Sequence, residues 1–272
     1  MIICMTIKGV KMNKVKARLI EHYEYVTQKG YEIFGLYLQG SQNYKLETEN
    51  SDVDTKCIIL PSLEDIVLNK PPISTTIVLE NNEHIDIKDI RVMFGCFKKQ
   101  NINFIEILFT EYKIINDKYK DLDDALTICN EEIARIDYNK ALKCMLGMAH
   151  QKYAALKHPY PSLLDKIEKF GYDPKQLHHI VRLKMFIERY TNGESYKDCL
   201  VESEKNRDFL IKIKNGEYSL EEAEIMAREY IGMVNKIYSE HMSCINSKAL
   251  NILEKVQVEA IKRYLKERLW QD

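Results

Sequence analysis

The pattern of apolar positions in the first 90 residues switches between helical and strand-like spacing. In residues 12–29, Val15, Leu19 and Val26 recur at helical spacing, and Gly30 ends the pattern. Short apolar runs bounded by glycine, proline or asparagine follow, which is typical of buried strands and hairpins. A further helix is predicted to begin after Ser62. The predicted strands cover residues 31–39, 52–60, 74–80 and 84–90.

From residue 90 onward the apolar spacing is helical almost throughout. A group of strands followed by a group of helices predicts an α+β fold with an α-helical C-terminal domain. The polar segment 112–120 marks the expected boundary, which divides the chain into domains 12–115 and 116–272. The predicted helices cover residues 90–100, 103–109, 121–136, 138–156, 162–169, 174–191, 205–213, 219–240 and 248–270.

Composition narrows the class of protein. The 272 residues carry a net charge of −1, with 45% hydrophobic and 30% charged residues, which is an ordinary globular profile without a global basic field for nucleic acid. No apolar run is long enough to span a membrane, and the first residues lack a signal-peptide pattern. Seven cysteines without a Cys-x-x-Cys pair argue against a disulfide framework and a structural zinc site. We therefore expect a cytoplasmic protein without a membrane partner.

Paired carboxylates are the strongest chemical signal. Asp52 and Asp54 stand two apart at the start of a predicted strand, so both face one side, about 6.5–7 Å apart at Cα. Their mutual repulsion favours a divalent cation between them. Asp86 in a neighbouring predicted strand faces the same side by pattern, whereas Asp89 would face the opposite side. Three carboxylates around two ions, Mg²⁺ or Mn²⁺, are suited to in-line attack on phosphorus.

Gly40 and Ser41 lie between a predicted strand and a short predicted helix that Ser41 is expected to cap. A glycine lets the backbone approach phosphate oxygens, and the serine adds a hydroxyl donor. A lone Gly-Ser pair is weak evidence. The pair becomes informative because Asp52-Val53-Asp54 follows about ten residues later.

These segments resemble the DNA polymerase β-like nucleotidyltransferase superfamily. Its motif, an apolar residue and Gly-Ser followed by Asp-apolar-Asp, matches residues 38–41 and 52–54, except that Gln39 replaces an apolar residue. The chain is more narrowly similar to the predicted nucleotidyltransferases of bacteria and phages with a GSQNYGL…SDxD motif, although Lys45 replaces the glycine. A later motif of that group, Gly-Tyr-Asp-x-Lys-x-x-x-His-x-x-Arg, matches residues 171–182, and residues 98–109 resemble its Asn-x-Asn…Glu stretch.

The resemblance implies a short mixed β-sheet with helices on one face and transfer of a nucleoside monophosphate from a nucleoside triphosphate, ATP above all, with release of pyrophosphate. It assigns catalysis and metal binding to Asp52, Asp54 and Asp86. Asp52 and Asp54 would hold both ions, and Asp86 would help hold the catalytic one and orient the attacking hydroxyl. The expected nucleotide-binding residues are Gly40, Ser41, Ser51, Lys175, His179 and Arg182.

Several residues have two interpretations from sequence alone. Lys175, His179 and Arg182 share one helix face, which either binds the triphosphate or the acceptor or is a solvated basic surface. Asn101, Asn103 and Glu106 precede an apolar helix and are interpreted as capping residues. Glu106 could instead contact a base or sugar. The remaining ambiguous side chains are a structural or exposed His178, a surface or pocket Lys152, and a core or base-stacking Tyr44.

Two functions compete. The first is an enzyme that binds its nucleotide between the two domains and transfers the nucleotidyl group to a hydroxyl on structured RNA such as tRNA, on protein or on a small molecule. The second is a nucleotide-binding regulatory or antitoxin-like module with little turnover. A complete acid triad favours the enzyme, because a binding module does not need clustered carboxylates.

Overall fold

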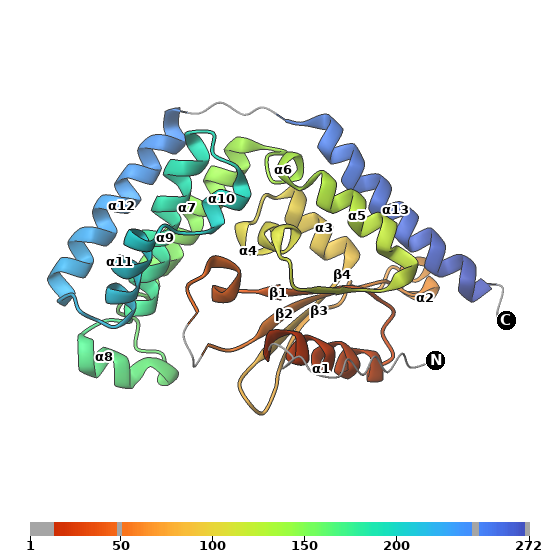
Figure 1. Cartoon of the computed structure of the whole chain (residues 1–272), viewed down its shortest axis with the longest axis horizontal. Helices are drawn as coiled ribbons and strands as arrows, with labels where there is room; N and C mark the ends of the chain where they lie inside the picture. The colour runs from red at the N-terminus through yellow and green to blue at the C-terminus, as the bar shows by residue number, and fades with distance from the viewer. Residues whose placement is uncertain (1–13, 48–50, 241–244, 270–272) are drawn as a thin grey trace, which may run out of the picture.

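A five-stranded mixed sheet forms the N-terminal part of the chain (Figure 1). The structure, a computed structural model, describes residues 14–47, 51–240 and 245–269. Strands β2 (Asp54–Ile59) and β4 (His84–Asp89) pair in parallel, and the other neighbours pair antiparallel. The spatial order is β3 (Ser74–Val78), β4 (His84–Asp89), β2 (Asp54–Ile59), β1 (Ile33–Gln39) and β5 (Lys113–Ile115).

Helices cover both faces of this sheet. On one face, Val15 and Leu19 of α1 (Lys14–Gln28) pack in a cluster with alternate residues of β1 such as Leu36. On the other face, Phe34 of β1 packs in a second cluster that includes Phe94 of α3 (Ile90–Lys98). The expected placement of helices on one face only is wrong, because β1 is apolar on both of its sides and each side must be buried.

From Ile90 onward, the named elements of the described chain are helices, with the exception of strand β5 (Lys113–Ile115). This confirms the α+β class with a helical C-terminal region. Helix α13 (Ser247–Leu269) returns along α3 and α5 (Lys120–Ile128) on the upper side of the sheet (Figure 1). Among the described helices, none is both long and apolar enough to cross a membrane. The α-helices after α1 and α3 are α2 (Leu63–Val67), α4 (Ile102–Ile105), α5 (Lys120–Ile128), α6 (Asn130–Ile133), α7 (Tyr138–Ala155), α8 (Leu164–Phe170), α9 (Pro174–Thr191), α10 (Tyr196–Leu200), α11 (Glu204–Lys214), α12 (Leu220–Glu240) and α13 (Ser247–Leu269), and the short 3₁₀ turns are η1 (Ser41–Tyr44), η2 (Glu106–Phe109), η3 (Asp117–Tyr119) and η4 (Pro161–Leu163).

Most predicted elements occur close to their expected bounds. Helix α9 covers residues 174–191 as predicted, because Asp173 caps it and Pro174 occupies its first position. Strand β5 and helix α10 were not predicted. Strand β5 lies within the segment expected to separate two domains and pairs with β1. The division at residues 115/116 therefore falls directly after the last strand of the sheet and stays a prediction.

Candidate functional site

A cavity of about 590 Å³ lies where the carboxyl end of β1 and the start of β2 face helix α9. Its volume is within the range of small-molecule sites. We call it the main cavity. All of the predicted site residues except Asp86 line it. The complete lining is Gln39, Gly40, Ser41, Tyr44, Leu46, Ser51, Asp52, Asp54, Lys56, Asn103, Glu106, Lys166, Lys175, His178, His179, Arg182 and Lys214.

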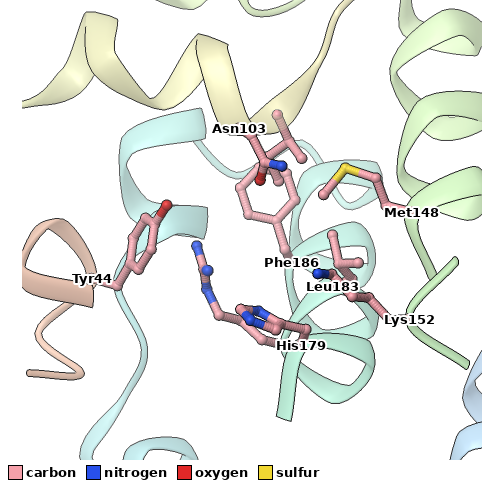
Figure 2. Close-up of a pocket in the computed structure, with 9 residues that line it drawn as sticks. Tyr44, Asn103, Met148, Lys152, His179, Leu183 and Phe186 are labelled. Atoms are coloured by element: carbon pink, nitrogen blue, oxygen red, sulfur yellow. The ribbon is translucent and has the colours of Figure 1, made fainter. Parts of the chain in front are cut away.

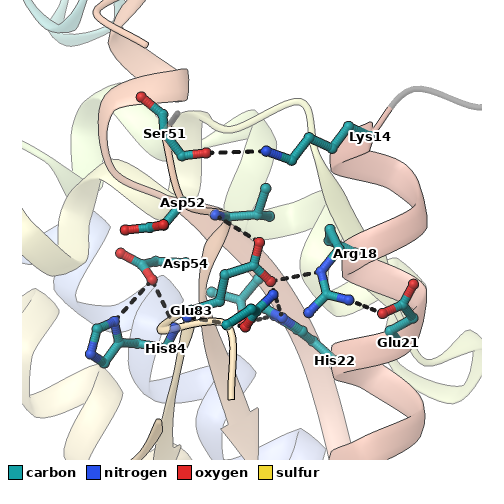
Figure 3. A network of polar contacts seen from close by, with 12 residues as sticks. Lys14, Arg18, Glu21, His22, Ser51, Asp52, Asp54, Glu83 and His84 are labelled. Carbon is teal, nitrogen blue, oxygen red and sulfur yellow. Dashed lines mark hydrogen bonds and ion pairs between the residues drawn. The ribbon is translucent and has the colours of Figure 1, made fainter. Parts of the chain in front are cut away.

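The two carboxylates at the start of β2 lie on the sheet side of the main cavity. Asp52 is exposed, and the Asp54 side chain is 33% exposed. One Asp54 oxygen accepts a hydrogen bond from the His84 backbone N–H at 2.8 Å and lies 3.1 Å from His84 Nδ1. Asp52 and Asp54 point to the same side, with the His84 ring next to Asp54 (Figure 3). The predicted pair is therefore present and open to the cavity.

Asp86, the third predicted carboxylate, lies on the expected face of the sheet but does not line the main cavity. The parallel register pairs Lys56 with Asp86 and thereby places His84, not Asp86, beside Asp54. Asp86 forms ion pairs with Lys88 at 2.8 Å and Lys56 at 3.6 Å, so its charge is already compensated. The expected convergence of Asp86 with Asp52 and Asp54 is not observed, because strand register, which local sequence does not encode, decides which residue is the neighbour.

The two carboxylates on the sheet side of the main cavity supply some, but not all, of the ligands that a hard divalent cation needs. Carboxylate oxygens are the ligands that Mg²⁺ and Mn²⁺ prefer, and Asp52 and Asp54 present them to one space. In residues 14–47, 51–240 and 245–269, no group of three or more His, Cys, Asp or Glu side chains is arranged to hold a metal ion. Asp52 and Asp54 would therefore hold an ion together with substrate oxygens or water, and the predicted pair of ions stays a prediction.

A buried polar network supports the backbone between the two carboxylates (Figure 3). The Val53 N–H donates to Glu83 at 3.3 Å. The other Glu83 oxygen accepts from Arg18 Nε at 2.7 Å and lies 3.1 Å from Nε2 of the fully buried His22. Burial is the largest single effect and raises the pKa of Glu83, but the hydrogen bonds from Arg18, Asn81 and the Val53 N–H, together with the charge of Arg18, outweigh it, so this pKa is lowered overall. The network holds an ionised carboxylate under the Asp52–Asp54 turn.

The turn after β1 lies at the same end of the sheet. Gly40 has φ of +92°, which favours glycine, and it precedes a single 3₁₀ turn and not an α-helix. Ser41 is the first residue of η1 and does not cap it, so the predicted capping role is wrong. The Gly40 N–H donates to Glu106, whose pKa burial raises to about 8 despite the nearby Arg182. At neutral pH Glu106 is therefore largely protonated.

Cationic side chains form the helical side of the main cavity. Lys175, His179 and Arg182 lie on one face of α9, as their spacing predicts, and Lys166 of α8 and Lys214 of α11 join them. Among the described residues, no carboxylate forms an ion pair with Lys175, Arg182 or Lys214. Burial, followed by the charge of Lys175, lowers the pKa of Lys214. Uncompensated positive charge on this side favours an anionic ligand.

The two histidines of α9, His178 and His179, also line the helical side of the main cavity, and both are neutral at neutral pH. Burial, together with the charges of Arg182, Lys214 and Lys175, lowers the pKa of His178 to about 3. Burial and the adjacent His178 hold the pKa of His179 well below its ordinary value. His178 is buried, which agrees with a structural role, but it also lines the main cavity. His179 can thus donate a hydrogen bond to an anion but adds no positive charge at neutral pH.

The buried His178 imidazole makes stability depend on pH with a defined sign. Between pH 3, the approximate pKa of His178 in the folded protein, and pH 6.5, its ordinary pKa, the unfolded chain binds a proton that the folded chain does not. The free energy of unfolding is therefore highest above pH 6.5 and falls as the pH is lowered below 6.5. Relative to His178→Gln, we expect wild type to lose about 1.4 kcal/mol of unfolding free energy per pH unit in this window. Urea unfolding of both proteins at about pH 7.5, 6 and 5 measures this difference. A difference that does not change with pH would contradict the assignment.

Three lining lysines were missed by the sequence analysis. Lys56 follows Asp54 by two positions in β2, so the strand alternation that pairs Asp52 with Asp54 could have placed it on the same face. Its pKa is lowered by burial, and its ammonium lies 4.7 Å from the centre of the Phe104 ring. Lys166 and Lys214 carry no local signal, because only the packing of α8 and α11 brings them to the cavity.

No protein-family model matches this sequence, and no curated protein matches it. The function must therefore be argued from the site itself. The site places two carboxylates on the sheet side opposite several cations on the helical side of one cavity. Such an arrangement can bind a polyphosphate whose charge is shared between a carboxylate-bound cation and basic side chains.

Proposed function

We propose that the protein is a metal-dependent nucleotidyltransferase that uses a nucleoside triphosphate, ATP above all. The observation that carries the proposal is the opposition of charges across the main cavity, with Asp52 and Asp54 on one side and Lys175, Arg182 and Lys214 on the other. A metal-free triphosphate would be repelled by the two carboxylates, and a cation without phosphate would leave the basic side chains uncompensated. A metal-bound triphosphate satisfies both sides.

The proposed reaction joins an acceptor hydroxyl oxygen to the α-phosphorus and breaks the bond from that phosphorus to the bridging oxygen of the β-phosphate. Pyrophosphate leaves, and the hydroxyl proton passes to solvent. A divalent ion bound by Asp52 and Asp54 would supply charge stabilisation at the α-phosphate. Arg182 and Lys175 would hold the outer phosphates, and the Gly40 turn would let the backbone approach them.

Incubation of the protein with each nucleoside triphosphate, Mg²⁺ or Mn²⁺ and candidate acceptors tests the proposal. The acceptors are structured RNA, protein and small hydroxyl compounds. We expect release of pyrophosphate and an acceptor mass increase equal to one nucleoside monophosphate. Absence of both products with every pairing would contradict transferase activity.

One observation favours the second candidate, a nucleotide-binding regulatory or antitoxin-like module with little turnover. Asp86 is engaged by Lys56 and Lys88 and lies outside the main cavity, so the acid triad that argued against a pure binding module is not assembled among the described residues. A binding module predicts nucleotide affinity that does not depend on metal. The proposed enzyme predicts the opposite.

A further inference from the structure

A second, smaller cavity adjoins the main cavity on its helical side. It encloses about 100 Å³, in a measure by which one water molecule requires about 10–15 Å³. Tyr44, Asn103, His179 and Arg182 line both cavities, so the two share a border. We call the smaller cavity the annex. A ligand bound in the main cavity could extend one compact group into it.

The walls of the annex are mainly apolar (Figure 2). Ile102 of α4 and Leu183 and Phe186 of α9 are each less than 9% exposed, and Met148 of α7 completes the apolar lining. A phosphate would lose its hydration here without compensation, whereas a flat aromatic ring would gain contact with apolar side chains. The annex is therefore suited to a different part of the ligand than the main cavity.

Besides His179 and Arg182, two polar side chains interrupt the apolar lining. Asn103 and Lys152 point into the annex (Figure 2), and neither side chain forms a hydrogen bond or ion pair with another described residue. The carboxamide of Asn103 offers both a donor and an acceptor, and the ammonium of Lys152 offers donors only. A ring with polar groups along its edge can use these partners, whereas an alkyl chain would leave them unpaired.

The border between the cavities is a stacked cation–aromatic pair. The Arg182 guanidinium carbon lies 3.4 Å from the centre of the Tyr44 ring. Tyr44 belongs to η1, directly after the Gly40 turn, and Arg182 belongs to the basic face of α9. If a ligand placed its phosphates on one side of this pair and a ring on the other, the middle of the ligand would contact Arg182.

We propose that the annex binds the nucleobase of the triphosphate whose phosphates lie in the main cavity, with Asn103 reading the edge of the base. This inference rests on one part of the proposed function, namely that the main cavity binds a nucleoside triphosphate. The base lies between the apolar side chains of α7 and α9, and its edge faces Asn103 and Lys152. A carboxamide at a base edge discriminates between bases by its donor and acceptor pattern.

Calorimetric titration of the full-length protein in Mn²⁺ tests the annex, with inorganic tripolyphosphate and each of the four nucleoside triphosphates as ligands. We expect at least one nucleoside triphosphate to bind 10-fold or more tightly than tripolyphosphate, as an order of magnitude for a buried base. Equal affinities for tripolyphosphate and all four nucleotides would overturn the annex proposal and leave the proposed function standing. No binding of any of the five ligands would contradict both.

Two variants sharpen this test. Met148→Trp fills the annex and should reduce nucleotide affinity to that of tripolyphosphate without changing tripolyphosphate binding, while Met233→Trp on the exposed face of α12 serves as the matched control. Asn103→Ala, at an exposed position that tolerates truncation, should change the order of affinities among the four nucleotides. Unchanged nucleotide affinity in a folded Met148→Trp protein, or an unchanged order of affinities in Asn103→Ala, would overturn the proposal.

Discussion

Replacement of Asp54 by asparagine is expected to lower nucleotidyl transfer about 10³-fold, which corresponds to about 4 kcal/mol of lost transition-state stabilisation. Asparagine keeps the side-chain shape and an oxygen that can still accept from the His84 N–H, but it removes the charge that holds a cation. Rates of pyrophosphate release by wild type and variant at saturating metal measure the effect.

The matched control for this variant is Asp124→Asn. Asp124 is exposed on α5, where it pairs with Lys120 outside both cavities. Exposed pairs of this kind contribute little to stability, so both stability and transfer should remain close to wild type. Equal rates for Asp54→Asn and Asp124→Asn would contradict the role given to Asp54.

Replacement of Glu83 by alanine is expected to cost about 3–5 kcal/mol of unfolding free energy. The Glu83 side chain is 5% exposed, and its loss would leave Arg18 and the Val53 N–H without their buried partner. Because Val53 lies between Asp52 and Asp54, the variant should also bind nucleotide more weakly in the presence of metal. Urea unfolding measures the stability loss.

Glu80→Ala serves as the control, because Glu80 lies in the same hairpin and is exposed. It should change the unfolding free energy by less than about 0.5 kcal/mol. A Glu83→Ala protein as stable as the Glu80→Ala protein would show that the buried network does not support the turn.

Local pattern predicted much of the fold. The apolar runs of β1 and β2, the capped start of α9 and the Ser62 capping box all depend on nearby residues, and each element occurs close to where it was expected. Strand β5 was missed because it has three residues and is stabilised by pairing with β1, not by its own composition. The helices expected on one face of the sheet occur on both, because the central strands β1 and β2 are buried on both sides.

The candidate site was predictable where a single element carries it. Asp52 and Asp54 share a strand, and Lys175, His179 and Arg182 share a helix, so their common faces follow from periodicity. The position of Asp86 relative to Asp54 depends on the register between two strands, and that register placed His84 next to Asp54. The neutral state of His179 depends on burial by the assembled helices, which no local pattern reports.

The most direct test of the central claim is the affinity for ATP, measured by calorimetry with Mn²⁺ and again after chelation of metal. If Asp52 and Asp54 share a metal-bound triphosphate with the basic side chains of α9, wild type should bind ATP about 10-fold or more tightly with Mn²⁺, and Asp54→Asn should lose most of this difference. Equal affinity of wild type with and without metal would contradict the claim and favour a module that only binds nucleotide.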